Sequence, residues 1–196
     1  QAQINAQAAA AAAAAGAPAP AHITVAVTDV VPLASTDPRG TGLTAAMFPL
    51  VMGGMIGGIA ISIAVIGALR RVLAVVVYSA VGGVLLTGIL AGWFGVLQGD
   101  FWTQAAVIAL ALAAIAAPIT GVVALIGRAG IAVGPIVMML FANPISGAAM
   151  PREFLPGVWG QVGQWFPPGA AANLLRDVSY FPQADASFSW LVLAGW

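Results

Sequence analysis

The sequence predicts an all-α polytopic membrane protein, a helical bundle of four complete and one partial transmembrane helices, with a short external β/loop segment and an outer interfacial helical hairpin. Hydrophobic residues make up 61% of the chain and charged residues 6%, whereas soluble domains carry about 25% charged residues. Four apolar stretches each reach the roughly 20 residues that a helix needs to cross a bilayer core. They cover residues 44–69, 72–97, 101–126 and 131–150.

The few charges between these stretches predict an orientation. Arg70 and Arg71 lie in the first gap, Asp100 in the second and Arg128 in the third. Arg and Lys in short loops favour the cytoplasmic side of a membrane. We therefore expect the three arginines to be cytoplasmic and the N-terminal segment to be extracytoplasmic. Residues 1–16 lack the pattern of a signal peptide, so this orientation predicts a further transmembrane helix ahead of the chain.

Residues 1–43 are expected to be the end of an extracytoplasmic domain that contains a helix, a strand and a turn. The alanine-rich residues 1–15 have high helix propensity and fit either the end of a long helix or a flexible tether. Residues 23–28 alternate Ile and Val with Thr and Ala, which is the period of a half-buried strand. Residues 35–40 have turn chemistry. His22 is the only histidine and is expected to lie on the surface.

Residues 151–186 are expected to form the interfacial hairpin. Apolar residues from Phe154 to Phe166 recur at helical spacing, and their tryptophans suit the headgroup boundary of a bilayer. The sequence Pro-Pro-Gly at 167–169 ends that helix, and residues 170–180 predict a second short one. The hairpin is either a packed cap over the bundle or a gate that lines an exit for lipid or solute. Residues 187–196 begin a further transmembrane helix.

Small residues predict where the helices pack. Three G-x-x-x-G pairs are present: Gly53 with Gly57, Gly54 with Gly58, and Gly88 with Gly92. Such residues let helix backbones approach closely in a membrane. Packing within the chain is expected at all three pairs, and a dimer face is the alternative. In the fourth stretch, Asn143-Pro144 interrupts the helix near its outer end, either as in broken helices that line cavities or as an ordinary proline near a helix end.

Composition excludes several classes of function. The chain has no lysine, so it holds no P-loop for ATP and no basic cluster for nucleic acid. It has no cysteine, which removes disulfide and thiolate chemistry. The first three stretches lack the ionisable group that proton- or sodium-coupled carriers place at mid-depth. No set of catalytic or metal-binding residues is visible, so we expect a protein that is not an enzyme and has no cofactor or metal.

Several sequence blocks resemble a known family. Two precede the first stretch, and four lie from the end of the fourth stretch onward: Asp29-Val-Val-Pro-Leu33, Asp37-Pro-Arg-Gly40, Asn143-Pro-Ile-Ser-Gly147, Met150-Pro-Arg-Glu-Phe-Leu-Pro156, Trp165-Phe-Pro-Pro-Gly169 and Asn173-Leu-Leu-Arg-Asp177. Together they resemble the membrane half of phage-infection-protein (Pip-like) members of the type-2 ABC transporter permease superfamily, in an actinobacterial form. The resemblance covers the chain from about residue 23 to its end.

The resemblance implies a function and a setting. The chain is then a multi-pass subunit of a bacterial plasma membrane, part of a six-helix permease-like unit that assembles as a homodimer or a larger membrane complex. It exports lipidic or amphipathic molecules with energy from a separate ATPase. Candidate residues of the exit region follow from location: Asn143, Pro144, Arg152, Glu153, Trp159, Trp165, Arg176 and Asp177.

The short cytoplasmic loops favour an alternative function. The loop at Arg70-Arg71 and the loop at 127–130 are too short to form an ATPase docking helix. In the alternative, the helices are a non-transporting anchor, and an extracytoplasmic domain binds an envelope, secretion or phage partner. Residue chemistry alone leaves both functions open, and the substrate is not readable from the sequence.

Overall fold

The computed structural model describes residues 2–18 and 31–196, and the chain divides into two units, residues 1–32 and 33–196. In the first unit, α1 (Ala2–Ala14) confirms a helix in the alanine-rich segment. It ends where Gly16 takes a φ of 64° and Ala17 N–H donates to Ala12 O at 2.9 Å, which is a glycine-based helix stop. The predicted strand at 23–28 and His22 lie outside the described residues.

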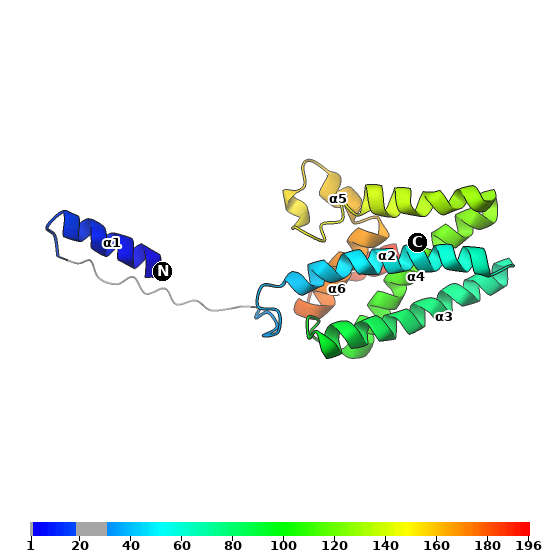
Figure 1. The fold of residues 1–196 in the computed structure, drawn as a ribbon, viewed down its shortest axis with the longest axis horizontal. Helices are drawn as coiled ribbons and strands as arrows, with labels where there is room; N and C mark the ends of the chain where they lie inside the picture. The colour runs from blue at the N-terminus through cyan, green and yellow to red at the C-terminus, as the bar shows by residue number, and fades with distance from the viewer. Residues whose placement is uncertain (1, 19–30) are drawn as a thin grey trace. The chain divides into compact units, whose positions relative to one another are not determined.

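The second unit is a bundle of helices (Figure 1). Its long elements are α2 (Thr41–Ala64), α3 (Ala68–Thr87) with its π-helical extension η1 (Gly88–Trp93), and α4 (Phe101–Ile126) with its 3₁₀ extension η2 (Gly127–Ala132). Among the described residues, three helical segments are long and apolar enough to cross a membrane: 41–64, 68–93 and 101–132. These segments confirm the first three predicted helices, and the described residues contain no strand.

The fourth predicted helix, over 131–150, is wrong in its extent. The chain is helical only to the end of η3 (Pro135–Ala142), and residues 143–151 form turns. The cause is local, because Ser146 Oγ donates to Asn143 O at 2.7 Å and Pro144 has no N–H to continue a helix. A helical stretch this short falls below the length of a span, so the count of four complete spans is not confirmed.

The predicted hairpin is also more broken than expected. Its first helix is reduced to η4 (Arg152–Phe154) and α5 (Trp159–Gly163). Its second helix, α6 (Pro167–Tyr180), begins on the two prolines instead of after them, because proline suits the first turn of a helix. The last helix, α7 (Ser187–Gly195), has nine residues, which agrees with the predicted start of a helix and tests no span.

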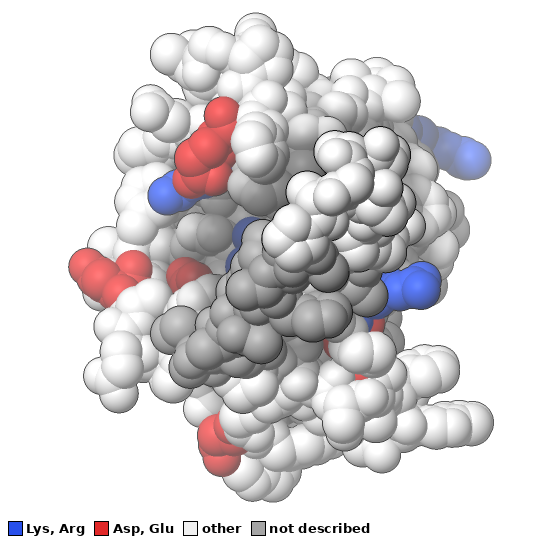
Figure 2. Space-filling view, turned by 90° about the vertical axis from the view of Figure 1, so that its left-hand side faces the viewer, with Lys and Arg blue, Asp and Glu red and all other residues white. Residues whose placement is uncertain are grey.

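Three of the six arginines lie at one end of the bundle, and Asp100 lies at the other. The α2–α3 turn and the α4–η3 turn lie at one end, and the loop from η1 to α4 and the 143–166 segment lie at the other (Figure 1). Arg70, Arg71 and Arg128 therefore share what we call the arginine end, and Asp100 lies at the opposite end. This separation agrees with the alternation in the sequence. Figure 2 faces the opposite end, where red and blue side chains stand among mostly uncharged residues.

Helix α4 is the centre of the packing. Its fully buried side chains Ile108, Leu112, Ile115 and Ile119 face the other helices, and α2, α3, α6 and α7 all contact it. One face of α3 is left apolar and exposed, including Leu73, Val77 and Leu85, as expected of a helix that faces lipid. The exposed apolar surface of α3 thus matches a membrane location.

The two overlapping glycine pairs of α2 pack within the chain, as expected. A Cβ at Gly54 would lie 2.7 Å from Ile115 Cβ, and one at Gly58 would lie 3.0 Å from Ala116 Cα. One at Gly57 would collide with the Tyr78 ring, and Gly53 lies beside the same surfaces, with Leu112 at 3.6 Å. Both pairs therefore let α2 approach its neighbours closely.

The third glycine pair departs from this expectation. The prediction that they pack within the chain is wrong for Gly88 and Gly92, because nothing lies within 4 Å of a Cβ built at either position. Both glycines are exposed and belong to η1, none of whose residues is buried. The physical reason is the rotation of this segment, which turns Gly88 and Gly92 away from the other helices. At Gly83, which the pattern missed, a Cβ would lie 2.6 Å from Ala105 O.

Candidate functional site

The end opposite the arginines is held together by contacts between distant segments. Asp37 accepts hydrogen bonds from Gly42 N–H at 2.6 Å and Thr41 N–H at 3.0 Å, which caps the start of α2. Bonds from Gly42, then from the backbone and hydroxyl of Thr41, keep the pKa of the Asp37 carboxyl below its usual value. Tyr180 Oη donates to Val96 O at 2.9 Å, so the η1–α4 loop is fixed to α6.

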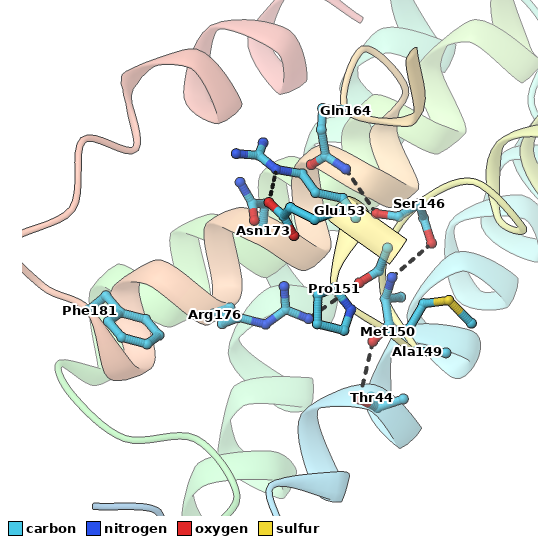
Figure 3. Close-up of a pocket in the computed structure, with 13 residues that line it drawn as sticks. Thr44, Ser146, Ala149, Met150, Pro151, Glu153, Gln164, Asn173, Arg176 and Phe181 are labelled. Carbon is cyan, nitrogen blue, oxygen red and sulfur yellow. Dashed lines mark hydrogen bonds and ion pairs between the residues drawn. The ribbon is translucent and has the colours of Figure 1, made fainter. Parts of the chain in front are cut away.

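A cavity of about 590 Å³ opens at this end, between the start of α2, the turns after η3, and α6 (Figure 3). We call it the polar cavity and this end of the bundle the cavity end. The polar cavity is lined by Thr44, Ser146, Gly147, Ala148, Ala149, Met150, Pro151, Arg152, Glu153, Gln164, Asn173, Arg176 and Phe181.

Hydrogen bonds hold the cavity wall in place. Thr44 Oγ1 donates to Ala148 O at 3.1 Å, which joins α2 to a segment 104 residues later. Ser146 Oγ accepts from Ala148 N–H at 3.2 Å, and Gln164 Nε2 donates to Ser146 O at 3.0 Å. Gly163 lies so close to Ile145 that any Cβ would collide with the Ile145 carbonyl oxygen. The 143–151 segment is therefore fixed from both sides.

Two guanidinium groups and one carboxylate supply the charge of the polar cavity. Arg152 Nε contacts Glu153 Oε1 at 3.1 Å, and both side chains are exposed. A hydrogen bond from its own backbone N–H, then the Arg152 side chain, lower the pKa of Glu153. Arg176 extends from α6 toward Pro151 (Figure 3) and donates from Nη2 to Gly147 O at 3.4 Å. With both arginines charged and Glu153 ionised, the lining carries one net positive charge.

Gln164 is the buried polar residue of the wall. It is 4% exposed, and its Nε2 faces two carbonyls, Ser146 O at 3.0 Å and Gly160 O at 3.4 Å. Its Oε1 is buried and has no hydrogen-bond partner in the described part of the chain. A buried acceptor without a donor costs free energy, so this oxygen is the atom of the wall that a bound donor would satisfy.

An apolar groove continues from the polar cavity. A second pocket, of about 560 Å³, shares Arg152, Glu153 and Gln164 with the polar cavity and extends to Trp165 and Phe188. From there an apolar groove of about 480 Å³ follows α7 to Leu191. The rings of Trp165 and Phe188 meet edge to face at 5.0 Å. The arrangement therefore runs from charged to aromatic and aliphatic surface without a break.

The structure brings some of the predicted exit residues together and separates others. Arg152, Glu153 and Arg176 line the polar cavity, and Trp165 lines the apolar groove. The remaining four lie elsewhere. Asn143 and Pro144 line a smaller pocket of about 240 Å³ that shares residues with the polar cavity, Trp159 packs edge-on against Phe141, and Asp177 lines a separate pocket with Asp100.

Asp177 has an electrostatic environment of its own. Burial raises the pKa of its carboxyl, and the positive charges of Arg176 and Arg152 offset part of that increase. Sequence reasoning missed Thr44, Gln164 and Asn173 as lining residues, because neutral polar side chains have no signal of their own. Hydrogen bonds to the 143–151 segment reveal Thr44 and Gln164, and Asn173 is revealed by its place in the cavity lining.

The site offers recognition by charge, hydrogen bonds and apolar contact. In the described residues no three His, Cys, Asp or Glu side chains group together in a way that could hold a metal ion. No family model, no curated protein and no solved structure matches the chain. The function is therefore inferred from the geometry of the polar cavity and the apolar groove.

Proposed function

We propose that this chain is an integral membrane, permease-like subunit that exports lipidic or amphipathic molecules and is energised by a separate ATPase. One observation supports this proposal most directly: a charged cavity is connected to an apolar groove by a pocket that shares lining residues with both, at the end of the bundle away from Arg70, Arg71 and Arg128. An amphipathic molecule needs both surfaces at once, because its head must stay solvated while its tail stays out of water.

The charge distribution supports the direction of transport. The arginine end is cytoplasmic if the positive-inside rule applies, so the polar cavity opens on the extracytoplasmic side of a bacterial plasma membrane. A molecule that reaches the polar cavity has then crossed the bilayer. Assembly as a homodimer or in a larger membrane complex belongs to the same proposal, since the three spans found among the described residues are few for a transport pathway.

The energy source is proposed from what the spans contain. The segments 41–64, 68–93 and 101–132 hold no Asp, Glu or His, and their only charged residues are the three arginines at the arginine end. A proton-coupled carrier needs a titratable group within the membrane. The chain also has no lysine, which a P-loop requires. A separate ATPase is therefore the partner that we propose.

A second function, a non-transporting anchor for an extracytoplasmic domain, is favoured by the turns at the arginine end. Only Val65–Gly67 separates α2 from α3, which leaves no docking helix for an ATPase. A test separates the two functions by measuring transport in inverted membrane vesicles. A fluorescent phospholipid analogue should become protected from dithionite only when ATP is added, and the double variant Arg152→Gln/Arg176→Gln should slow this step.

Two results would reject the permease. One is protection of the lipid analogue from dithionite that does not depend on ATP and is the same in vesicles from wild-type and deletion strains, together with purification of the chain free of any ATPase. The other is full biological function after the helices are replaced by an unrelated membrane anchor, which only the anchor function allows. The matched control is Arg70→Gln/Arg128→Gln, which removes two positive charges at the arginine end and leaves the polar cavity unchanged.

A further inference from the structure

We propose that the polar cavity binds the headgroup of an anionic lipid that carries hydroxyl groups, and that an acyl chain of the same lipid lies in the apolar groove along Trp165, Phe188 and Leu191. This inference rests on the proposed export function and names its substrate class. Phosphatidylglycerol has the required chemistry, a phosphate next to a glycerol with free hydroxyls, and it is the probe for the test.

The guanidinium groups favour a phosphate. Each guanidinium has five N–H donors in a planar fork. In the described residues, Arg152 uses its Nε for Glu153 and Arg176 uses one Nη2 donor for Gly147 O. The remaining donors of both residues are available to a ligand, and phosphate oxygens match them as paired acceptors. The net positive charge of the lining favours an anionic headgroup over a zwitterionic one.

Gln164 favours a hydroxyl. Its amide N–H groups face two backbone carbonyls, and this fixes Oε1 as an acceptor that lacks a donor. Among lipid headgroups with a phosphate, a choline group has no donor to offer, whereas a glycerol hydroxyl can donate. Gln164 lines both the polar cavity and the pocket that leads to Trp165, so it lies where a headgroup passes into its acyl chains.

The groove favours a lipid over a free phosphate ester. Its apolar residues continue directly from the charged ones, with Trp165 and Phe188 shared between the connecting pocket and the groove. Phe188 and Leu191 are exposed at 42% and 72%, so the groove is open to an acyl chain. A soluble headgroup would leave this surface unused, whereas each methylene of an acyl chain that the groove buries adds to the affinity.

Lipid retention measured by native mass spectrometry on the full chain in detergent tests the site. Phosphatidylglycerol, phosphatidylcholine and phosphatidylmethanol are compared with identical acyl chains. We expect phosphatidylglycerol to bind about tenfold more tightly than phosphatidylcholine. Arg152→Gln/Arg176→Gln should remove this preference, whereas the charge-matched control Arg70→Gln/Arg128→Gln should keep it. A preference that survives in the first variant, or is lost equally in both, overturns the headgroup site.

Two further comparisons test the hydroxyl and the acyl chain. Phosphatidylmethanol has the same charge but no hydroxyl, so it should bind about threefold more weakly than phosphatidylglycerol. Equal binding contradicts the role of Gln164. Leu191→Gln, an exposed position at which folding is not at risk, should weaken all three lipids alike. Displacement of the lipid by glycerophosphoglycerol at equal concentration would instead identify a free headgroup as the ligand.

Failure of this inference is distinguishable from failure of the proposed function. Lipid retention requires no ATPase and no transport. Selective binding without ATP-dependent export would therefore support the lipid site and reject the permease function. ATP-dependent export with no headgroup preference would support the permease function and reject the anionic lipid as its substrate.

Discussion

The two ends of the bundle differ in how their segments are held together. At the arginine end, neighbouring helices are joined by local turns, and Arg71 donates from Nε to Val65 O at 2.9 Å and from Nη2 to Ser62 O at 3.0 Å. At the cavity end, segments far apart in sequence meet, as when Thr44 donates to Ala148 O. Local turns tolerate change, whereas a wall made of distant segments depends on close fit. The cavity end is therefore where substitutions should cost most and where we place the function.

Glycine substitutions should show the largest difference between the ends. Gly163 at the cavity end has no room for a Cβ against Ile145 O, whereas Gly127 at the arginine end has nothing within 4 Å. Gly163→Ala should destabilise the fold by about 3 kcal/mol. Gly127→Ala should cost only about 1 kcal/mol, because of its φ of 69°. Thermal unfolding in detergent measures both. Equal losses would mean that the two ends are alike in packing.

The cap on α2 should give the next largest effect. Asp37→Ala removes the acceptors for Gly42 N–H, Thr41 N–H and Thr41 Oγ1. We expect the melting temperature at pH 7 to fall by about 4 °C. The folded pKa of Asp37 is lowered, so its contribution is complete above about pH 4, the value for a free Asp, and is lost as the pH falls through the lower folded pKa.

The pH profile separates this cap from a packing effect. Wild type and Asp37→Ala should converge in melting temperature as the carboxyl is protonated. A gap of constant size from pH 7 down to pH 2 would contradict the electrostatic role of Asp37 and assign the loss to its packing against Gly42.

The turn at the arginine end should respond more weakly. Arg71→Gln removes the bonds to Ser62 O and Val65 O, which are carbonyls at the end of α2, and should destabilise the fold by about 1 kcal/mol. Arg70→Gln is the matched control, because Arg70 is exposed and should contribute less than about 0.5 kcal/mol. The same melting experiment compares them, and a loss in Arg70→Gln equal to that in Arg71→Gln would indicate an effect of charge alone.

The sequence predicted the spans well because hydropathy over about 20 residues is a local property. It did not predict which glycines pack. Gly54 and Gly58 have the same spacing as Gly88 and Gly92, but only the first pair faces another helix. The facing surface depends on the relative rotation of helices, which spacing does not encode. The fourth helix was predicted too long, because residues 143–150 carry no charge although Pro144 and the Ser146–Asn143 bond end the helix.

The polar cavity was predicted only in part. Charged residues such as Arg152 and Arg176 stand out in an apolar sequence, and location alone suggested them. Gln164 and Thr44 act through bonds to backbone carbonyls of a distant segment. Such bonds could not be predicted from the sequence, because every residue has a backbone carbonyl and only the fold decides which one lies near Gln164 or Thr44.

The smallest expected effect concerns charge at the cavity end and has the opposite sign to the others. Burial raises the pKa of Asp177, so the folded state binds a proton more readily than the unfolded state, and stability falls as the pH rises through the interval above about 4. Asp177→Asn removes this cost and should raise the free energy of unfolding slightly at pH 7.5, by less than about 0.5 kcal/mol since the side chain is half-exposed. At pH 4 the gain should disappear.

Asp100→Asn is the contrasting variant. Bonds from the backbone and hydroxyl of Thr103 lower the pKa of Asp100, so Asp100→Asn should lose stability at pH 7.5. If Asp177→Asn also loses stability there, attraction to Arg176 outweighs burial, and Asp177 supports the arginine that the polar cavity uses.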